Sequence, residues 1–476
     1  NYITNSAAPD FSISLEKVKQ IEVLRGPASS LYGNVALTAV VNIITKQGAD
    51  VDGIQVKAGA GNYGQLRGDI VIGKRYFDLD VLAWASVYGS KGERRTVDEE
   101  YYGSNREGDT FSDARIGRVG DHPSYDMGFQ LGYKGWRMLY NTRFSQIVAP
   151  FTNSILACAY DRDRYRDFNG IKPSFANSSQ HADLSYDTQL GVFNLNFGAI
   201  FDKGDVTQYQ VLGEAMSTAI ELAFLFPHEA QDKDGLARYF NGQEQNYGLR
   251  MRHSYNYTFG SNHKGSILLG AEYTHLQLDG VRYQVVYDYE NESAERPKVR
   301  ELSLGHENAA NASLQLKHQW RSLILNAGVR YDHKHRIDNA YINEWSPRIA
   351  LILLRPKWNI KLSYSKAFVD APYIYGIQHT ASIIDAGINE AFLLNPERLH
   401  SWQLMFAGNN WVEGLDFEVN CFYNRASNLI QKKSLSVVNY DYNHVAGIEL
   451  RGSYHHQRFT ADVDLTWTHT IKSDIG

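Results

Sequence analysis

A stretch in the first half of the chain, YDRDRYRDF (Tyr160–Phe168), alternates acidic, basic and aromatic residues. Arg162 and Arg164 carry planar guanidinium groups, which bind carboxylates or phosphates through two hydrogen bonds at once. The stretch could therefore hold an anionic ligand. The simpler interpretation is a solvated loop in which Asp161 and Asp163 neutralise the neighbouring arginines.

The sequence contains none of the motifs that carry the commonest enzyme chemistries. There is no P-loop, no G-x-S-x-G, no H-E-x-x-H and no C-x-x-C pair. GAGNYG (Gly59–Gly64) looks like a phosphate loop, but it joins two predicted strands, so we interpret it as a hairpin turn. DEEYY (Asp98–Tyr102) is acidic, yet its spacing matches no calcium cage. We therefore predict that the protein is not an enzyme and has neither a resident metal nor an intrinsic cofactor.

The elements that position these residues must be strands. The chain has 476 residues, 13% aromatic residues and a mean hydropathy of −0.41. Its longest apolar runs, such as IALILL (Ile349–Leu354), are strand-sized, and no run reaches the 18 residues of a transmembrane helix. A net charge of −5 gives no electrostatic reason to expect a nucleic-acid partner.

From about residue 52 onward, apolar and polar residues alternate with period two. In LDFEVNCFYNR (Leu415–Arg425), one face carries Leu415, Phe417, Val419, Cys421 and Tyr423, and the other carries Asp416, Glu418, Asn420 and Asn424. Such segments are about ten residues long, the length that a tilted strand needs to cross hydrocarbon. A soluble sandwich would alternate too, but full charges on the polar face suit a wet lumen, as in a transmembrane antiparallel β-barrel.

Connection lengths support the barrel. Short turns are predicted at Gly73–Tyr76, Tyr133–Trp136, His318–Ser322, Arg355–Trp358 and His455–Arg458, and long loops at about Gly89–His122, Ile147–Ser178, Asp202–Gln243, Asp279–Gly305 and Phe368–Glu397. The pattern predicts about 17 strands. Single-chain bacterial barrels close with an even number, and open edges in lipid are unfavourable. We therefore expect an incomplete chain, or further strands supplied elsewhere.

The first fifty residues differ from the rest. IEVLRGPASSLYG (Ile21–Gly33) joins a short strand to a Gly-Pro turn and a run of small residues, and a continuous apolar strand follows at Val40–Ile44. This stretch resembles the end of the plug domain in the TonB-dependent outer-membrane receptors, which has the form IEVLRGPxSxLYGxxAxxGVxNIITK. The matching motif residues include Glu22, Arg25, Gly26, Pro27 and Gly33. One departure is Thr38-Ala39, where the family usually has a glycine.

The resemblance implies a fold and a domain organisation. Residues 1–50 are the C-terminal part of a plug, and residues 51–476 are an outer-membrane barrel that has 22 strands when complete. The front of the plug, including the segment that contacts the energy-transducing TonB-type protein, and the last strands are then expected to be missing. A multi-pass location in the outer membrane of a Gram-negative cell follows, with lipids as partners and a surface lipoprotein as a further possible partner.

In this family, plug arginines pair with acidic residues of the barrel wall. The resemblance therefore gives Arg25 an interior role, and Glu272, in LLGAEYTH, is our candidate partner for it. Such a latch would hold the plug in the lumen. Removing one partner of a buried pair costs more than breaking a surface pair.

A second local resemblance concerns ligand contacts. Ser363–Gly376 and Leu393–Leu404 resemble paired boxes of many family members, and haem receptors carry a histidine between the boxes. His379 occupies that position and is a candidate axial ligand for haem, although Asp370 stands where haem receptors have arginine. With 16 histidines in the chain, an exposed loop histidine is the simpler interpretation.

Two tyrosines in the first of these boxes are further candidates. Tyr373 and Tyr375 could line the ligand chamber by aromatic stacking, or could belong to the aromatic girdle of the barrel.

The implied function is TonB-dependent active import of a scarce ligand. A ferric siderophore is the leading expectation, with haem and cobalamin as alternatives. A passive pore or a structural surface barrel is the alternative from another class, and it differs in predicting an open lumen.

Overall fold

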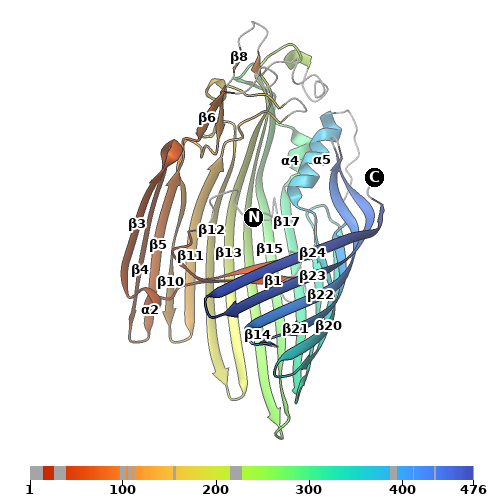
Figure 1. Cartoon of the computed structure of the whole chain (residues 1–476). Coiled ribbons are helices and arrows are strands. Elements are labelled where there is room, and N and C mark those ends of the chain that lie inside the picture. The colour runs from red at the N-terminus through yellow and green to blue at the C-terminus, as the bar shows by residue number, and fades with distance from the viewer. Residues whose placement is uncertain are drawn as a thin grey trace.

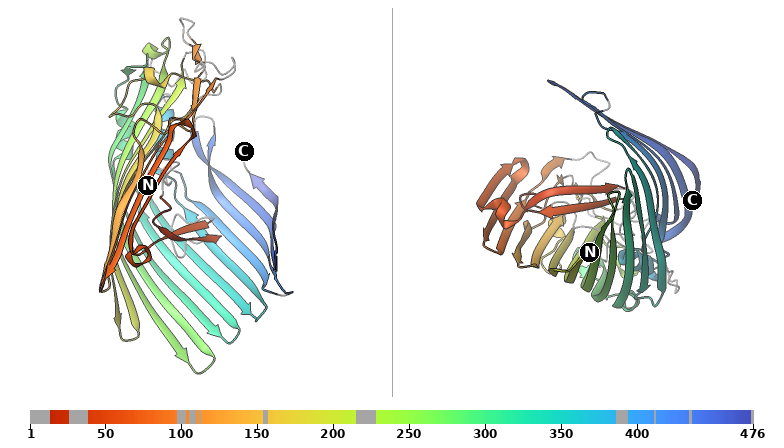
Figure 2. Two further views of the ribbon diagram at one scale, coloured as in Figure 1. Left: turned by 60° about the vertical axis from the view of Figure 1, so that its left-hand side comes forward. Right: turned by 90° about the horizontal axis from the view of Figure 1, so that it is seen from below.

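One curved antiparallel sheet dominates the computed structural model, with two of its helices at one end and a third, shorter helix near the other end (Figure 1). The structure describes residues 14–25, 39–96, 103–104, 110–111, 113–153, 157–214, 228–385, 394–410, 412–433 and 436–474. We call the end with the long connections the loop end and the opposite end the turn end. Two strands cross the concave side of the sheet, and Figure 2 shows them inside it.

Seventeen long strands form the wall within the described residues, in agreement with the predicted number of about 17. They are β3 (Gly53–Gly61), β4 (Gln65–Tyr76), β5 (Leu79–Gly89), β10 (Ser124–Tyr133), β11 (Trp136–Ile147), β12 (Ser174–Leu190), β13 (Phe193–Gly213), β14 (Leu236–Phe259), β15 (His263–Tyr287), β17 (Gly305–Trp320), β18 (Leu323–His335), β19 (Tyr341–Leu354), β20 (Trp358–Val369), β21 (Glu397–Gly408), β22 (Leu415–Lys433), β23 (Ser436–His456) and β24 (Phe459–Asp474). Their antiparallel pairing confirms the predicted fold class.

Smaller elements occupy the lumen and the loop end. They are β1 (Val18–Arg25), β2 (Ala39–Thr45), α2 (Gly48–Val51), β6 (Glu93–Thr96), β7 (Gly103–Ser104), β8 (Thr110–Phe111), β9 (Asp113–Ile116), β16 (Asn291–Glu292), α4 (Pro297–Ser303) and α5 (Tyr373–Asp385), with 3-10 turns at Asn62–Gly64, Arg162–Arg164 and His228–Ala230. Among the described residues, no helix is long and apolar enough to span a membrane.

The wall is not closed. Its strands follow one another in chain order from β3 to β24, and β24 and β3 are the two strands that would have to pair to close it. Within the described residues, however, register pairs join β24 only to β23 and β3 only to β4. Both strands are exposed along almost their whole length, as sheet edges are, and Figure 2 shows the two edges apart.

The two faces of the wall differ as the alternation predicts. On β24, Val463, Leu465 and Trp467 are more than half exposed, as lipid-facing residues of a barrel are. The other face of the same hairpin carries Arg451, which pairs with Asp464 at 3.4 Å. Apolar and charged residues therefore separate onto opposite faces.

Three expectations about connections need correction. The segments Asp202–Gly213, Leu236–Gln243 and Asp279–Tyr287, predicted as loop, are strand, because β13, β14 and β15 extend beyond the apolar band. The turn predicted at Gly73–Tyr76 lies after Tyr76, where Phe77 adopts a left-handed conformation (φ 51°).

A helix, α5, also replaces part of the predicted long loop after Phe368. By contrast, Gly59–Gly64 joins β3 to β4 and is confirmed as a hairpin turn.

Candidate functional site

The N-terminal segment forms a small sheet inside the wall. β1 and β2 pair antiparallel, with Ile21 opposite Ile43 and Arg25 opposite Ala39. Both segments contain valine and isoleucine, which favour strands: β1 mixes them with charged residues, and β2 is apolar almost throughout. Figure 2 shows the pair spanning the concave side of the wall. The described residues 14–25 and 39–51, which we call the plug segment after the predicted domain, therefore lie on the concave side of the wall, and their assignment to a plug domain stays a prediction.

A buried ion pair ties this segment to the wall. The Lys17 Nζ donates to both Asp126 oxygens at 2.7 Å, and the two side chains are 6% and 1% exposed. Trp84 Nε1 and Asn141 Nδ2 also donate to Asp126, at 2.9 and 2.8 Å. Burial lowers the pKa of Lys17, and the Asp126 carboxylate opposes that effect. Since the Asp126 carboxylate accepts from three side chains, it is well satisfied.

Further contacts fix the segment on either side of this pair. The Ser14 hydroxyl donates to Asp69 at 3.1 Å, and the Thr45 hydroxyl donates to Gln130 at 2.9 Å. At α2, the Gly48 backbone N–H donates to Asp80 at 2.7 Å. Polar groups from β4, β5 and β10 thus anchor the plug segment along one side of the wall.

The other end of β1 approaches the opposite side. Leu24 lines a cavity with Leu268 of β15, Arg348 of β19 and Lys361 of β20. Glu272 lies on β15 four residues beyond Leu268, on the same face of the strand. The Arg25 side chain lies outside the described residues, so its pairing with Glu272 stays a prediction.

Of the remaining motif residues, one lies within the described residues and three lie outside them. Glu22 is exposed on β1 and accepts hydrogen bonds from Gln20 and Asn42, each at 3.0 Å. Gly26, Pro27 and Gly33 lie outside the described residues.

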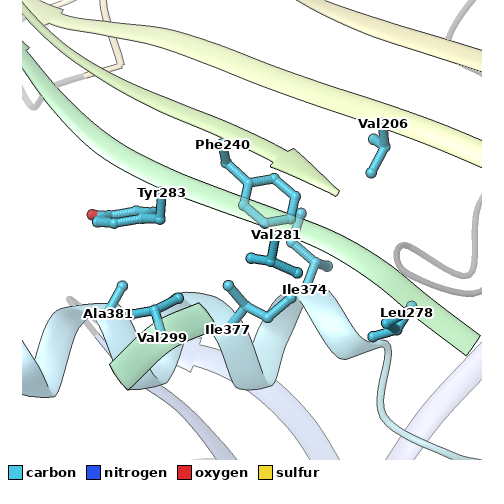
Figure 3. Close-up of a cluster of buried hydrophobic side chains, with 9 residues drawn as sticks. All are labelled: Val206, Phe240, Leu278, Val281, Tyr283, Val299, Ile374, Ile377 and Ala381. Carbon is cyan, nitrogen blue, oxygen red and sulfur yellow. The ribbon is translucent and has the colours of Figure 1, made fainter. Parts of the chain in front are cut away.

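At the loop end, α4 and α5 pack on the extended strands through a buried apolar cluster. Ile374, Ile377 and Ala381 point from α5 toward the side chains of its neighbours (Figure 3). Their spacing of three and four residues places them on one helix face. The other members of the cluster are Val206, Phe240, Leu278, Val281, Tyr283 and Val299. This cluster fixes α5 at the loop end of the wall.

Charged groups surround the start of α5. Lys334 Nζ contacts Glu307 at 2.9 Å and Asp370 at 2.6 Å, and all three residues are buried. The Tyr373 hydroxyl donates to Glu307, and burial raises the pKa of Tyr373 well above its usual value. Asp370, the departure from the haem-receptor pattern, is thus a partner of Lys334.

The other predicted ligand contacts of this region lie on α5. Tyr375 is 38% exposed, on a different side of the helix from Ile374 and Ile377. The backbone of His379 is part of α5, and its side chain lies outside the described residues. A pocket between the helices is lined by Leu302, Arg336, Tyr373, Gly376, Ile377 and Thr380.

The arginine-rich stretch folds onto the extended strands. Arg162 is buried and makes two hydrogen bonds to Asp121, at 3.0 and 2.7 Å, and a third to the Pro173 carbonyl at 2.9 Å. Arg164 is exposed and lies 4.1 Å from the ring centre of Tyr289. The structure therefore gives Arg162 protein partners, and of the two arginines it leaves Arg164 more accessible.

An aromatic cluster beneath this stretch encloses one acid. Its members are Tyr160, Tyr165, Phe168, Tyr209, Val211, Ala237, Tyr239, Val286 and Tyr289. The Tyr289 hydroxyl donates to Glu214 at 2.8 Å, and burial raises the pKa of Glu214 to about 7. Glu214 directly follows β13, beyond the apolar band, so this group lies outside the membrane-spanning segments.

Sequence reasoning missed the Lys17–Asp126 pair. Lys17 and Lys19 both lie in EKVKQ, where nothing in the local pattern separates them. Lys19 is 53% exposed and pairs with Asp50 at 2.8 Å, whereas Lys17 is buried. What distinguishes the two lysines is the position of β10, which brings Asp126 next to Lys17.

The sequence matches a protein-family model and several curated proteins. The family model "TonB dependent receptor-like, beta-barrel" matches residues 59–476. The chain is 25% identical over 432 residues to the vitamin B12 transporter BtuB of Vibrio cholerae, which covers 87% of this chain and 56% of that protein. The chain thus spans about half the length of the curated relatives that it matches.

Solved structures share the fold. The FrpB iron transporter of Neisseria meningitidis superposes with a TM-score of 0.62 at 14% identity, covering 97% of this chain and 69% of that one. The siderophore receptor PiuA of Acinetobacter baumannii gives 0.63 at 12% identity, covering 96% and 70%. The ferric yersiniabactin uptake receptor FyuA of Yersinia pestis gives 0.60 at 11% identity, covering 95% and 67%. With a family match over most of its length, this chain belongs to the TonB-dependent receptors.

Proposed function

We propose that the protein imports a scarce ligand across the outer membrane, driven by a TonB-type energy-transducing protein that acts on the plug. The observation that carries this proposal is the plug segment held across the lumen by the buried Lys17–Asp126 pair. A lumen that contains a bound segment suits gated import better than free diffusion. The outer membrane and its lipids are the setting of this proposal, and a surface lipoprotein is a further proposed partner.

A ferric siderophore is the proposed cargo, since PiuA is described as a siderophore receptor and FyuA as a ferric yersiniabactin uptake receptor. Haem and cobalamin are the alternatives, because HasR of Serratia marcescens is described as a hemophore receptor and BtuB as a vitamin B12 transporter. The cargo is transported and is not a resident cofactor. We place its first contacts at the loop end, with Tyr373, Tyr375, His379 and Arg164 as candidates.

Growth of a deletion strain on defined nutrients tests the proposal. The strain receives a panel of ferric siderophores, haem or cobalamin, each as the limiting nutrient, with and without the restored gene. We expect the restored gene to rescue growth on at least one ferric siderophore, and rescue to vanish when the TonB-type protein is also deleted. Rescue by haem or cobalamin alone would redirect the cargo assignment, and equal growth with and without the gene on every nutrient would refute import.

A further inference from the structure

The lipid-facing side of β22 changes character in a fixed order toward the loop end. Phe417, Val419, Cys421, Tyr423 and Arg425 lie on one face of the strand, because they are two residues apart. The face is apolar through Cys421, aromatic at Tyr423 and cationic at Arg425. A headgroup layer above hydrocarbon would meet these residues in the same order.

Register pairing extends this order across four strands. At the level of Cys421, the partners on β21 and β23 are Leu404 and Ile448. At the level of Tyr423, the β21 partner is Trp402, which in turn pairs with Tyr364 on β20. The next level, which we call the basic row, contains His400, Arg425, His444 and Lys472 on β21, β22, β23 and β24.

Tyrosines hold parts of the basic row in place. The Tyr364 hydroxyl lies 2.9 Å from His400 Nδ1, and the Tyr423 hydroxyl lies 3.1 Å from His444 Nδ1. Lys472 Nζ lies 4.6 Å from the ring centre of Tyr442. The aromatic level therefore supports the two histidines of the basic row, and Tyr442, which lies nearer the loop end, contacts Lys472.

The positive charge of the basic row is only partly offset on its own face. In the described part of the chain, none of its four residues takes part in a salt bridge, although Asp474 follows Lys472 on the same face. The opposite face of these strands is mixed, since Arg451 pairs with Asp464 and Asn420 donates to Glu449. Two permanent cations, Arg425 and Lys472, are thus directed outward, away from the lumen.

We propose that the basic row is a binding surface for the phosphate groups of lipid headgroups in the outer leaflet. Two residues of strand rise about 6.6 Å, so Arg425 lies that far beyond Tyr423 toward the loop end. Aromatic residues such as Tyr423 lie at the membrane–water interface, at the level of the headgroups. Guanidinium and ammonium groups at that level attract phosphates and can hydrogen bond to them. The lipid is favoured over a free anion because the row is continuous with the apolar face beneath it. This inference does not depend on the identity of the cargo.

Lipid titration of the detergent-solubilised protein, followed by native mass spectrometry, tests the surface. The probe is lipid A, a diphosphorylated glycolipid, and its dephosphorylated form is the reference. We expect the double variant Arg425→Gln/Lys472→Gln to bind lipid A at least about tenfold more weakly. The matched control, Arg451→Gln, changes a cation on the opposite face of β23 and should bind as the wild type does.

A conservative variant and a competition experiment complete the test. Arg425→Lys retains the charge and should retain most of the binding, which separates loss of charge from misfolding. Inorganic phosphate at millimolar concentration should not displace lipid A. Equal affinity of the double variant and the wild type, or equal affinity of the wild type for both lipid forms, would overturn the proposal.

Discussion

Lys17 gives the plug segment its strongest described tie to the wall. Its ammonium is buried against Asp126, and a buried charge without its partner is far more costly than an exposed one. The exposed pair Lys57–Glu16, at 2.7 Å, joins the same segment to β3 but lies in contact with solvent. Burial, and not distance, separates the two pairs.

Replacing Asp126 with Asn should loosen the plug segment by about 3 kcal/mol, because Lys17 then stays buried without a carboxylate. Hydrogen exchange of residues 14–25 in the reconstituted protein measures the change as faster exchange. The control Lys57→Met should shift exchange by less than about 1 kcal/mol. If both variants exchange alike, the buried pair is not what holds the segment.

Glu214 should make the aromatic cluster at the loop end sensitive to pH. Its pKa is raised to about 7 by burial in the closed cluster and returns to its ordinary, lower value when the cluster opens. Between those two values the closed form binds a proton that the open form lacks. The stability of the closed form is therefore greatest at acidic pH and falls as pH rises toward 7, by at most about 3 kcal/mol.

Hydrogen exchange of residues 160–168, corrected for intrinsic rates, should show more opening at about pH 8 than at about pH 5. Glu214→Gln should remove that dependence, while Glu229→Gln, at an exposed position, should leave it unchanged. A pH dependence that survives in Glu214→Gln would assign the effect to another group.

Strands of the wall were predictable because lipid and lumen impose opposite polarity on alternate residues. In β22, the run from Leu415 to Tyr423 carries that contrast, and its predicted faces are confirmed by the register with β21 and β23. Beyond the membrane the contrast ends. Asp202–Gly213 and Asp279–Tyr287 are strands covered by helices and loops instead of lipid, so their sequences lack the contrast that marks a membrane strand.

The helix α5 could not be predicted for a different reason. YIYGIQHTASIID contains glycine and β-branched residues, which weaken local helix propensity. Its stability comes from packing, since Ile374, Ile377 and Ala381 are buried against strands distant in sequence. The sequence also does not show which face of α5 packs on the strands, so it could not assign Tyr373 and Tyr375 to the buried or the exposed face of the helix.

Opposite sides of α5 should respond differently to truncation. Ile377→Ala removes a buried side chain from the cluster and should destabilise α5 by about 2–4 kcal/mol. Tyr375→Ala changes an exposed side chain and should leave stability within about 0.5 kcal/mol while weakening uptake of the cargo. Thermal unfolding and uptake, measured on both variants, check the assignment. A Tyr375→Ala protein with normal uptake would remove that tyrosine from the candidate contacts.

The whole molecule combines a wall with two chemically distinct faces and a segment that crosses its concave side. The wall is common to pores and receptors, so the fold alone does not separate them. What separates them is whether residues 1–50 obstruct the lumen. The polar anchors at Lys17, Thr45 and Gly48 are the features that make obstruction the expected state.

Conductance in planar bilayers tests this obstruction most directly, with the protein compared before and after deletion of residues 1–50. The deletion variant is first checked for an intact β-sheet spectrum and for membrane insertion. We predict little steady current from the protein with its plug segment, and large, salt-dependent channels once that segment is removed. A large steady current from the protein that retains residues 1–50 would contradict gated import and favour a passive pore.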